Sequence, residues 1–249
     1  MSNASTKKNS SQANAALDEI AWVVSCEHAT NDIPAPWQHL FTDAEVLQSH
    51  RGWDPGAAGV ARYFGRQLPA QVFLGQVSRL LADNNRSAGH PKIHAPAVRA
   101  LPKRDREAII KAWHAPHQDG VCKAVNAALA GAKRVIHISC HSFTPELNGR
   151  TRTADVGLLY DPKCGGEADL ARRWQQALQT VSSLRVRRNY PYRGDEDGMI
   201  RILRRRFGPR VLGFELELNQ AMLAQGEFSS SLQTALLDAL KVAAQTDEN

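Results

Sequence analysis

Val135-Ile-His-Ile-Ser-Cys-His-Ser-Phe-Thr-Pro145 is the stretch of this 249-residue chain on which the fold prediction depends. It opens as a short apolar run with β-branched residues, which predicts a buried strand. His141, Ser142 and Thr144 follow where this strand should end, before a proline and a polar, glycine-containing loop. In open α/β sheets, ligands bind outside the carboxyl ends of the strands, so this polar cluster is a candidate site.

Segments with the pattern of strands and of helices alternate along most of the chain. This alternation predicts an α/β fold with three layers, in which helices cover both faces of a central, mixed but mostly parallel sheet. The tail at 1–16 is rich in Ser, Asn, Ala and Lys and is predicted to be disordered, and 17–249 is predicted to form a single domain. Strands are predicted at 20–26, 71–78, from 135, 154–160, 184–188 and 211–219, and helices at about 55–68, 104–113, 120–130, 166–181, 198–207 and 229–244.

The charge of the chain narrows the choice of partners. The formal net charge is +6 and the pI is near 9.3, which fits nucleic acid or acidic small molecules. The basic residues are dispersed and no nucleic-acid-binding signature accompanies them, so a small anionic substrate is favoured over nucleic acid. No apolar run approaches the roughly 20 residues of a membrane helix, and the first residues lack the order of a secretory signal. We therefore expect a cytoplasmic protein with no membrane partner.

Two other predicted strands also carry ionisable residues. Glu27 and His28 follow the first strand, where a simple strand-to-loop transition with an incidental histidine is the alternative. Glu215 and Glu217 occupy alternate positions in the last strand and must therefore point to the same side. Carboxylates inside an apolar strand are costly to bury unless they are paired or bound to a metal, and an exposed edge strand is the alternative here.

Three further features could belong to the same site. Asp54 can cap the helix that follows it, and capping alone would explain an aspartate there. The loop Arg79-Leu-Leu-Ala-Asp-Asn-Asn-Arg86 gathers an aspartate, two amides and two arginines, which suits recognition of a carboxylate; a solvated loop is the alternative. His114 and His117 have the spacing of one helical face, but Pro116 between them argues against a regular helix and a metal pair.

The residue types at these positions point toward metal-dependent hydrolysis. Two histidines and a carboxylate are a common ligand set for a catalytic zinc that keeps one position open for water, and a further Glu can act as a general base. The ligands are dispersed rather than packed into HExxH, so a non-catalytic anion- or metabolite-binding protein stays open. The four cysteines lack CxxC spacing, which argues against structural zinc and disulfides, and a hydrolase based on Cys26 is the third hypothesis.

Several short motifs follow one another in a specific order between about Val23 and Leu223. They are Ser25-Cys-Glu-His-Ala-Thr-Asn-Asp-Ile-Pro34, Trp53-Asp-Pro-Gly-Ala57, Ser78-Arg-Leu-Leu81, Asp83-Asn-Asn-Arg86, His141-Ser-Phe-Thr-Pro145, Asn189-Tyr-Pro-Tyr192 and Glu217-Leu-Asn219. Each piece is weak by itself, whereas their joint order is quite specific. In this order the chain resembles the N-formylglutamate amidohydrolase family.

The resemblance implies a fold related to zinc carboxypeptidases and aspartoacylases, of the phosphorylase/hydrolase-like type. It also implies hydrolysis of the formyl or other acyl amide of an acidic amino acid, with N-formyl-L-glutamate and its conversion to formate and L-glutamate as the first expectation, a step of histidine degradation. Glu217 matches the late-strand acid that acts as general base, with Glu215 in support. The run Glu-Leu-Glu-Leu-Asn leaves open which of the two glutamates does this.

The resemblance further implies a bound divalent metal, zinc first and another divalent ion second. By analogy to the carboxypeptidase layout, His28 and His141 would be metal ligands. Asp54 is the first choice for the third ligand, and Glu27 is its rival. Glu27 would point away from its neighbour His28 if the strand geometry continues.

The resemblance also assigns the substrate-binding residues. Asn85 and Arg86 are similar to the carboxypeptidase Asn-Arg pair that holds a substrate carboxylate, and Arg79 would be a second anchor. Arg150 and Arg152, in the loop after the central strand, are additional candidates for binding the substrate or for a scaffold role. The oligomeric state stays open, as does the question whether His114 and His117 line the site.

Overall fold

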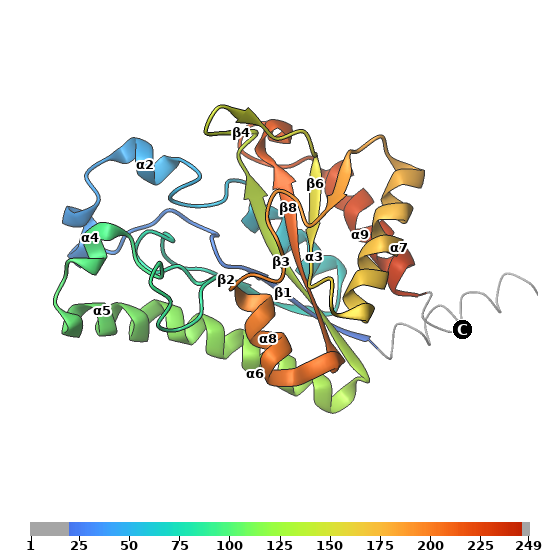
Figure 1. Ribbon diagram of the computed structural model, residues 1–249, viewed down its shortest axis with the longest axis horizontal. Helices are drawn as coiled ribbons and strands as arrows, with labels where there is room; N and C mark the ends of the chain where they lie inside the picture. The colour runs from blue at the N-terminus through green and yellow to red at the C-terminus, as the bar shows by residue number, and fades with distance from the viewer. Residues whose placement is uncertain (1–19, 246–249) are drawn as a thin grey trace, which may run out of the picture.

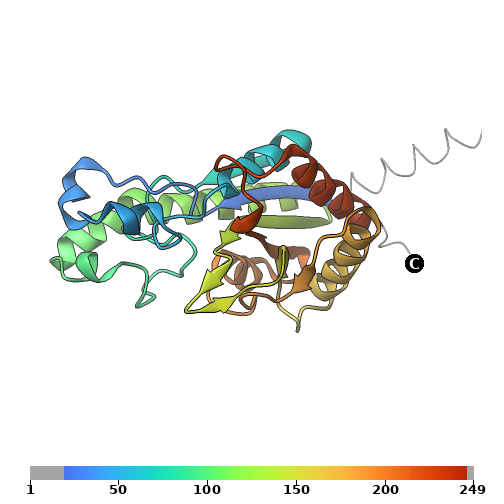
Figure 2. The same cartoon turned by 90° about the horizontal axis from the view of Figure 1, so that it is seen from above.

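The computed structural model describes residues 20–245 (Figures 1 and 2). The tail predicted for residues 1–16 lies outside this range, so it stays a prediction, as does the single domain over 17–249. A central sheet lies between helices on both of its faces, and a lobe of helices and loops extends from it, to the left in Figure 1. The predicted three-layer α/β architecture is confirmed.

Six strands form the central sheet, in the order β2-β1-β3-β8-β6-β7. Strand β6 runs antiparallel to β8, and the other neighbouring pairs are parallel, so the sheet is mixed and mostly parallel, as predicted. Strand β8 lies in the interior of the sheet, so the edge-strand alternative is wrong. The strands are β1 (Ile20–Cys26), β2 (Ala70–Leu74), β3 (Arg134–Phe143), β6 (Val156–Leu159), β7 (Val186–Arg188) and β8 (Val211–Asn219), with β4 (Glu146–Leu147) and β5 (Arg150–Thr151) as a separate antiparallel pair.

The two faces of the sheet differ in polarity because side chains alternate along each strand. One face is apolar along the central strands and packs into the main core. The other face is apolar only at the amino ends of the strands, where Val23, Val135 and Val211 join a second core. Toward the carboxyl ends, alternate positions of this second face are polar and buried: Ser25 and Glu27, His137, Ser139 and His141, and Glu215 and Glu217.

Each core is closed by its own set of helices. The main core includes side chains of α3 (Ala57–Gln67), α7 (Gly165–Val181) and α9 (Ser230–Ala244), and the second includes side chains of α6 (Ala115–Gly131) and α8 (Met199–Phe207). A third cluster of buried apolar side chains lies in the lobe, which also contains α2 (Ala44–Gln48), α4 (Pro96–Arg99) and α5 (Lys103–Ile109). Short 3-10 helices occupy Ala35–Leu40, Gly208–Arg210 and Gln220–Met222.

Four strands differ from the prediction: β6 and β7 are shorter than the predicted 154–160 and 184–188, and the ends of β2 and β3 also differ. Strand β2 ends at Leu74 rather than at residue 78, because the chain turns at Gly75 against the backbone of Glu27. A Cβ atom at Gly75 would lie 2.1 Å from the Glu27 carbonyl oxygen, so only glycine fits there. Strand β3 continues to Phe143, which pairs with Asn219 of β8. The polar residues at the end of β3 are therefore inside the strand and fixed by its ladder.

The helices also correct the prediction at two places. Asp54 does not cap α3: the cap residue is Gly56, whose φ of 77° places it in the left-handed region that favours glycine. The helices predicted at 104–113 and 120–130 belong to one continuous helix, in which a π-helical turn at Ile110–His114 joins α5 to α6. In the part of the chain that the structure describes, no helix has the length and apolar character to cross a membrane.

Candidate active site

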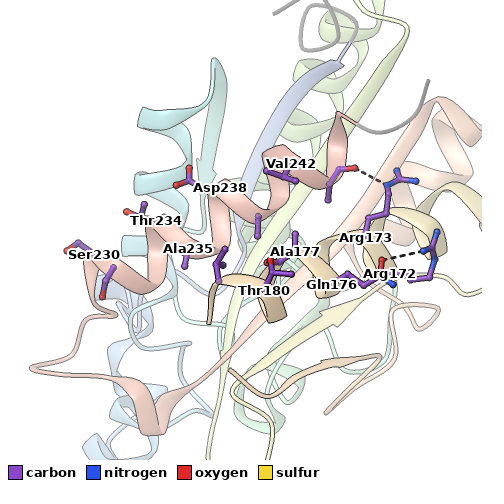
Figure 3. A pocket seen from close by; sticks show the side chains of 14 residues that line it. Arg172, Arg173, Gln176, Ala177, Thr180, Ser230, Thr234, Ala235, Asp238 and Val242 are labelled. Carbon is purple, nitrogen blue, oxygen red and sulfur yellow. Dashed lines mark hydrogen bonds between the residues drawn. The ribbon is translucent and has the colours of Figure 1, made fainter. Parts of the chain in front are cut away.

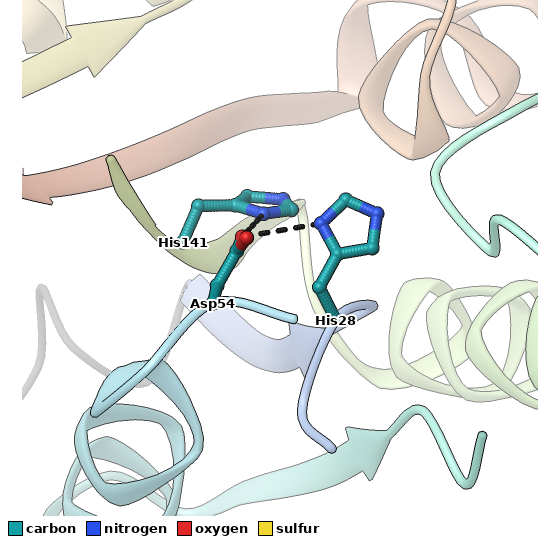
Figure 4. A group of neighbouring side chains, drawn as sticks. All are labelled: His28, Asp54 and His141. Carbon is teal, nitrogen blue, oxygen red and sulfur yellow. Dashed lines mark hydrogen bonds and ion pairs between the residues drawn. The ribbon is translucent and has the colours of Figure 1, made fainter. Parts of the chain in front are cut away.

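Three buried side chains meet at the carboxyl ends of β1 and β3 (Figure 4). His28 follows β1, His141 lies near the end of β3, and Asp54 precedes α3. The backbone N–H of Asp54 donates to the carbonyl of His28, which fixes one loop against the other. The Nδ1 atoms of His28 and His141 lie 3.1 and 2.8 Å from Oδ2 of Asp54. One ligand atom from each residue therefore lies within 4.8 Å of the others, which suits a single metal ion.

A buried carboxylate supports each of the two imidazoles from behind. The Nε2 atom of His28 lies 2.7 Å from Oδ1 of Asp83, and the Nε2 atom of His141 lies 3.2 Å from Oε2 of Glu27. Histidines that bind metals usually donate their second N–H to such a carboxylate, which fixes the tautomer and the ring orientation. Nε2 of His141 also donates to the hydroxyl of Ser139 at 2.8 Å, so the two Nδ1 atoms face Asp54 and are the candidate metal-binding atoms.

The charges in this cluster favour a cation. Burial would raise the pKa of Asp54, but His28 and His141 outweigh burial and hold that pKa well below its usual value. Burial opposes the charge on His141, yet Asp54 and Glu27 raise its pKa well above the usual value. Burial and Arg79 oppose the charge on His28, whose pKa is nevertheless raised by Asp83 and Asp54. Positive charge is therefore stabilised at the point where the three side chains meet.

The cluster opens into a pocket of about 400 Å³ whose walls carry most of the predicted site residues. Glu217 pairs in register with His141 across β3 and β8, and it shares the pocket wall with Glu215, as their alternate spacing predicted. The lining residues are His28, His50, Arg51, Asp54, Arg79, Leu80, Asn85, Arg86, His141, Ser142, Phe143, Thr144, Tyr192, Arg193, Glu196, Asp197, Glu215 and Glu217.

The carboxyl groups of the two glutamates of β8 differ in their hydrogen bonding. Glu215 accepts a hydrogen bond from the side-chain amide of Asn85 at 3.1 Å. Oε2 of Glu217 is buried and has no hydrogen-bond partner among the described residues. Burial raises the pKa of Glu217 to about 8, and Asp54 and Glu215 add to this rise. Glu217 is therefore the carboxyl group that is free to exchange a proton with a bound molecule.

Three of the predicted substrate-binding residues line the pocket, namely Arg79, Asn85 and Arg86. The guanidinium of Arg79 bridges Asp54 and Asp83 at 3.4 Å each. It is therefore part of the charged network around the candidate metal-ligand cluster, which consists of His28, Asp54 and His141. Arg86 donates to the backbone carbonyl of Asp197 at 3.1 Å.

Arg152, another candidate, is not part of the pocket wall. Its guanidinium lies over the rings of Tyr192 and Phe143, at 5.0 and 5.8 Å from their centroids, and it donates to the carbonyl of Thr144. Tyr192, Phe143 and Thr144 do line the pocket, so Arg152 braces three wall residues from behind.

Glu27, the rival ligand, lies outside the group of three. It is fully buried on the far side of His141, where it accepts a hydrogen bond from the hydroxyl of Ser139 and forms an ion pair with Nε2 of His141 at 3.2 Å, while that Nε2 atom donates to the oxygen of Ser139 at 2.8 Å. Burial would raise the pKa of Glu27, but His117 and His141 outweigh burial and hold that pKa well below its usual value. Strand β1 ends at Cys26, so the alternation of a strand does not extend to Glu27 and His28.

The sequence did not reveal all of the residues that form the site. Asp83 belongs to a quoted motif, but its contact with His28 depends on a fold that brings residues 55 positions apart together. His50 and Arg51 line the pocket and precede the Trp53-Asp-Pro motif; a polar pair beside a candidate ligand is the signal that could have found them. His114 and His117 are not part of the pocket wall.

Cys26 is an unsuitable nucleophile. Its side chain belongs to the main core, on the face of the sheet away from the pocket, and it is completely buried. Burial raises the pKa of this thiol well above its usual value, and Cys140, Asp54 and Glu27 add to that rise. The reactive form of a cysteine is the thiolate, so this environment disfavours catalysis by Cys26.

A larger groove of about 930 Å³ lies between α7 and α9, which cover the opposite face of the sheet (Figure 3). Its walls combine Ala177, Ala235 and Val242 with arginines and one aspartate, Asp238. The lining contains no histidine, cysteine or cluster of carboxylates. The smaller pocket over β3 and β8 is therefore the candidate active site, because it contains the buried titratable groups.

Comparison with known proteins agrees with this geometry. A model of the N-formylglutamate amidohydrolase family matches residues 20–224, a range that includes the metal-ligand cluster and the pocket glutamates. The chain belongs to the N-formylglutamate amidohydrolase family. The resemblance predicted from the order of the motifs is thereby confirmed, and the family supports a hydrolase. Among curated proteins, no sequence matched this member of the family.

Two solved structures share this fold. The gene product Atu2144 from Agrobacterium tumefaciens is 30% identical, with a TM-score of 0.80 over 96% of this chain and 94% of that chain. An N-formylglutamate amidohydrolase from Ralstonia eutropha JMP134 is 19% identical, with a TM-score of 0.62 over 90% of this chain and 91% of that chain. A metallo-carboxypeptidase from Burkholderia cenocepacia shows a remote likeness, with 14% identity and a TM-score of 0.37 over 92% of this chain and 56% of that chain.

Proposed function

We propose that this protein is a metal-dependent amidohydrolase that removes the formyl or another acyl group from an N-acylated acidic amino acid. N-formyl-L-glutamate is the first candidate substrate. The observation that carries the proposal is the position of Glu217, a buried carboxyl with a free oxygen, directly across the strand ladder from His141 of the three-residue cluster. The family match supports the same reaction class.

His28, Asp54 and His141 would hold the metal. Their donor set of two imidazoles and one carboxylate fits zinc with one open position, and the carboxylates behind both imidazoles fit the usual surroundings of such ligands. Another divalent ion is the second choice. When bound, the metal would polarise the acyl carbonyl and lower the pKa of a water molecule.

Glu217 would transfer the proton. In the hydrolysis, water adds to the acyl carbon, the bond between that carbon and the nitrogen breaks, and formate and a free amino acid result. The carboxylate of Glu217 would take a proton from the attacking water and pass it to the leaving nitrogen, so that atoms and charge balance. Glu215 would support this indirectly, because it holds the amide of Asn85 on the pocket wall.

The basic residues of the pocket would select the substrate. Arg86 and Arg79 present guanidinium groups to the pocket, and such groups bind carboxylates through paired hydrogen bonds. Tyr192, supported by Arg152, would form part of the opposite wall. The partner expected for this pocket is a small anionic N-acyl amino acid, rather than nucleic acid or a membrane.

Metal analysis followed by a formate-release assay tests the proposal. We expect about one zinc per chain and release of formate from N-formyl-L-glutamate, with less from N-formyl-L-leucine, which lacks the second carboxylate. The His141→Ala variant should lose both the metal and the activity. A metal-free protein with undiminished amidase activity would overturn the metal-dependent mechanism. A protein that binds a ligand with thermal stabilisation and no turnover would instead support a binding protein on the same scaffold.

A further inference from the structure

One long helix passes behind the candidate active site. It runs from α5 in the lobe through a π-helical turn into α6, which lies beneath the sheet (Figure 1). Ile109 packs into the apolar cluster of the lobe, whereas Val121 and Val125 pack into the second core of the sheet. The loop Arg79–Arg86, called the arginine loop below, belongs to the lobe. The helix therefore connects this loop to the sheet that carries the candidate metal-ligand cluster.

The π turn lies at the middle of this helix. The N–H of Ala115 donates to the carbonyl of Ile110, five residues earlier, instead of four. Pro116 follows at once; it has no N–H, and in a regular helix its ring would clash with the carbonyl four residues before it. The wider turn accommodates this proline without breaking the helix. Such turns occur frequently at functional sites.

His114 and Gln118, which share one face of the helix, hold the arginine loop. The Nε2–H of His114 donates to the backbone carbonyl of Arg86 at 2.9 Å, and the side-chain amide of Gln118 donates to the same oxygen at 2.7 Å. Gln118 also reaches the carbonyl of Asn84 at 3.3 Å. The backbone of Arg86 is thereby fixed by two donors from the helix.

His117, between these two residues in sequence, faces a different partner. Its Nε2 atom lies 3.6 Å from Oε1 of Glu27, and both side chains are buried. Neither Oε1 of Glu27 nor Nε2 of His117 has a hydrogen-bond partner among the described residues, so their contact is an ion pair at a distance beyond hydrogen-bond range. Oε2, the second oxygen of Glu27, contacts Ser139 and His141. Among the described residues, His117 is the one whose side chain lies within ion-pair distance of this outer oxygen of Glu27.

We propose that His117 is a positioning residue for the metal centre, acting through Glu27 on the imidazole of His141. The proposal rests on the proposed function, since it takes His141 as a metal ligand. His117 sets the orientation of the Glu27 carboxylate, and Glu27 in turn holds the ring of His141 with its Nδ1 atom toward Asp54. His114 lies one turn away on the same helix. Among the described residues its side chain hydrogen-bonds the carbonyl of Arg86, and it forms no hydrogen bond or ion pair with Glu27 or His141.

The test compares variants of these two histidines in the full-length protein. In His117→Leu, an apolar side chain of similar volume removes the imidazole that lies 3.6 Å from Oε1 of Glu27, whereas His117→Gln supplies an amide that can donate to it. His114→Leu removes one donor from the Arg86 carbonyl and serves as the matched control. Val125→Ala loosens the packing of the same helix in the second core and controls for general destabilisation.

Zinc affinity is measured at one fixed pH by competition with a chromophoric chelator, since metal binding is itself pH-dependent. Loss of a residue that supports a metal ligand from outside typically weakens binding by about 10- to 100-fold, and we expect roughly tenfold for His117→Leu because it acts through one more contact. His117→Gln should recover most of the affinity. His114→Leu and Val125→Ala should bind zinc as the wild type does, and His114→Leu should instead raise KM.

The outcomes separate the proposal from the proposed function. Equal zinc affinity in His117→Leu and wild type would overturn the positioning role, as would an equal loss in His117→Leu and Val125→Ala. The visible spectrum of the cobalt-substituted protein gives a second readout, because it should change in His117→Leu and not in His114→Leu. A wild-type protein that binds zinc but hydrolyses no N-acyl amino acid would refute the proposed function, while the zinc measurements would still decide the role of His117.

Discussion

Substitution of the buried acid Glu217 by glutamine should make the metal-free protein more stable, and increasingly so as the pH rises. Burial raises the pKa of this carboxyl from 4.5 to about 8 in the folded protein. The folded state therefore holds the proton more tightly than the unfolded chain does. The resulting stabilisation is complete below pH 4.5 and is lost as the pH rises through 8. The neutral amide of Glu217→Gln does not undergo this loss.

The size of the effect follows from the two pKa values. A rise from 4.5 to about 8 corresponds to about 5 kcal/mol of unfolding free energy in full, at about 1.4 kcal/mol for each pH unit between them. Between pH 5.5 and 7.5, the difference in stability between Glu217→Gln and wild type should therefore grow by about 3 kcal/mol. The other titrating groups of the site are common to both proteins and largely cancel in this difference.

Urea unfolding in the presence of a chelator measures this difference at a series of pH values. Glu215→Gln is the matched control, since it alters the neighbouring acid of the same strand face and retains Glu217. That control should keep the loss of stability with rising pH that the wild type shows. A stability difference between Glu217→Gln and wild type that stays constant from pH 5.5 to 7.5 would refute the reasoning.

Three further predictions concern other parts of the molecule. Arg86→Ala should raise KM for N-formyl-L-glutamate by about tenfold or more while changing kcat less, because a hydrogen bond to a charged group is lost; steady-state kinetics with an unchanged KM would contradict this. Arg204→Met should lower the free energy of unfolding in urea by about 3 kcal/mol, because the buried carboxylate of Glu167 loses the guanidinium that contacts it at 2.7 Å. An unchanged free energy of unfolding would show that the backbone N–H groups that donate to Glu167 are sufficient. Cys26→Ala should retain formate release, since the thiol is buried on the opposite face; loss of turnover with intact folding would revive a cysteine mechanism.

The elements predicted best from the sequence are those whose periodicity is set by burial. β1 and β8 begin and end at the predicted residues, because buried side chains continue to the last position of each strand. Alternation also placed Glu215 and Glu217 on one side correctly. Boundaries set by close backbone approach were missed. The end of β2 depends on the fit of Gly75 against Glu27, which no local pattern reveals.

The candidate site was predictable where its residues follow strands, as His28 and His141 do. The choice between Asp54 and Glu27 could not be made from spacing, because it depends on which loop packs over His28. Local capping preferences also offered an alternative role for Asp54. The contact of His117 with Glu27 has no local signal at all: it depends on the register of a distant helix, which a π turn before Pro116 shifts.

Several buried polar atoms around the candidate site have no hydrogen-bond partner, which indicates that these residues are present for function rather than for stability. Buried polar groups in proteins are almost always hydrogen-bonded, and an isolated exception calls for an explanation. Here Oε1 of Glu27 and Oε2 of Glu217, on the polar face of the sheet, and Nε2 of His117, on α6, are exceptions. A sequence selected for stability alone would place apolar side chains on this face, as it does at the amino ends of the same strands. Along β1, β3 and β8, this face changes from valine at the amino ends to glutamate and histidine toward the carboxyl ends. We therefore infer that these polar residues lower the stability of the fold and are present for function.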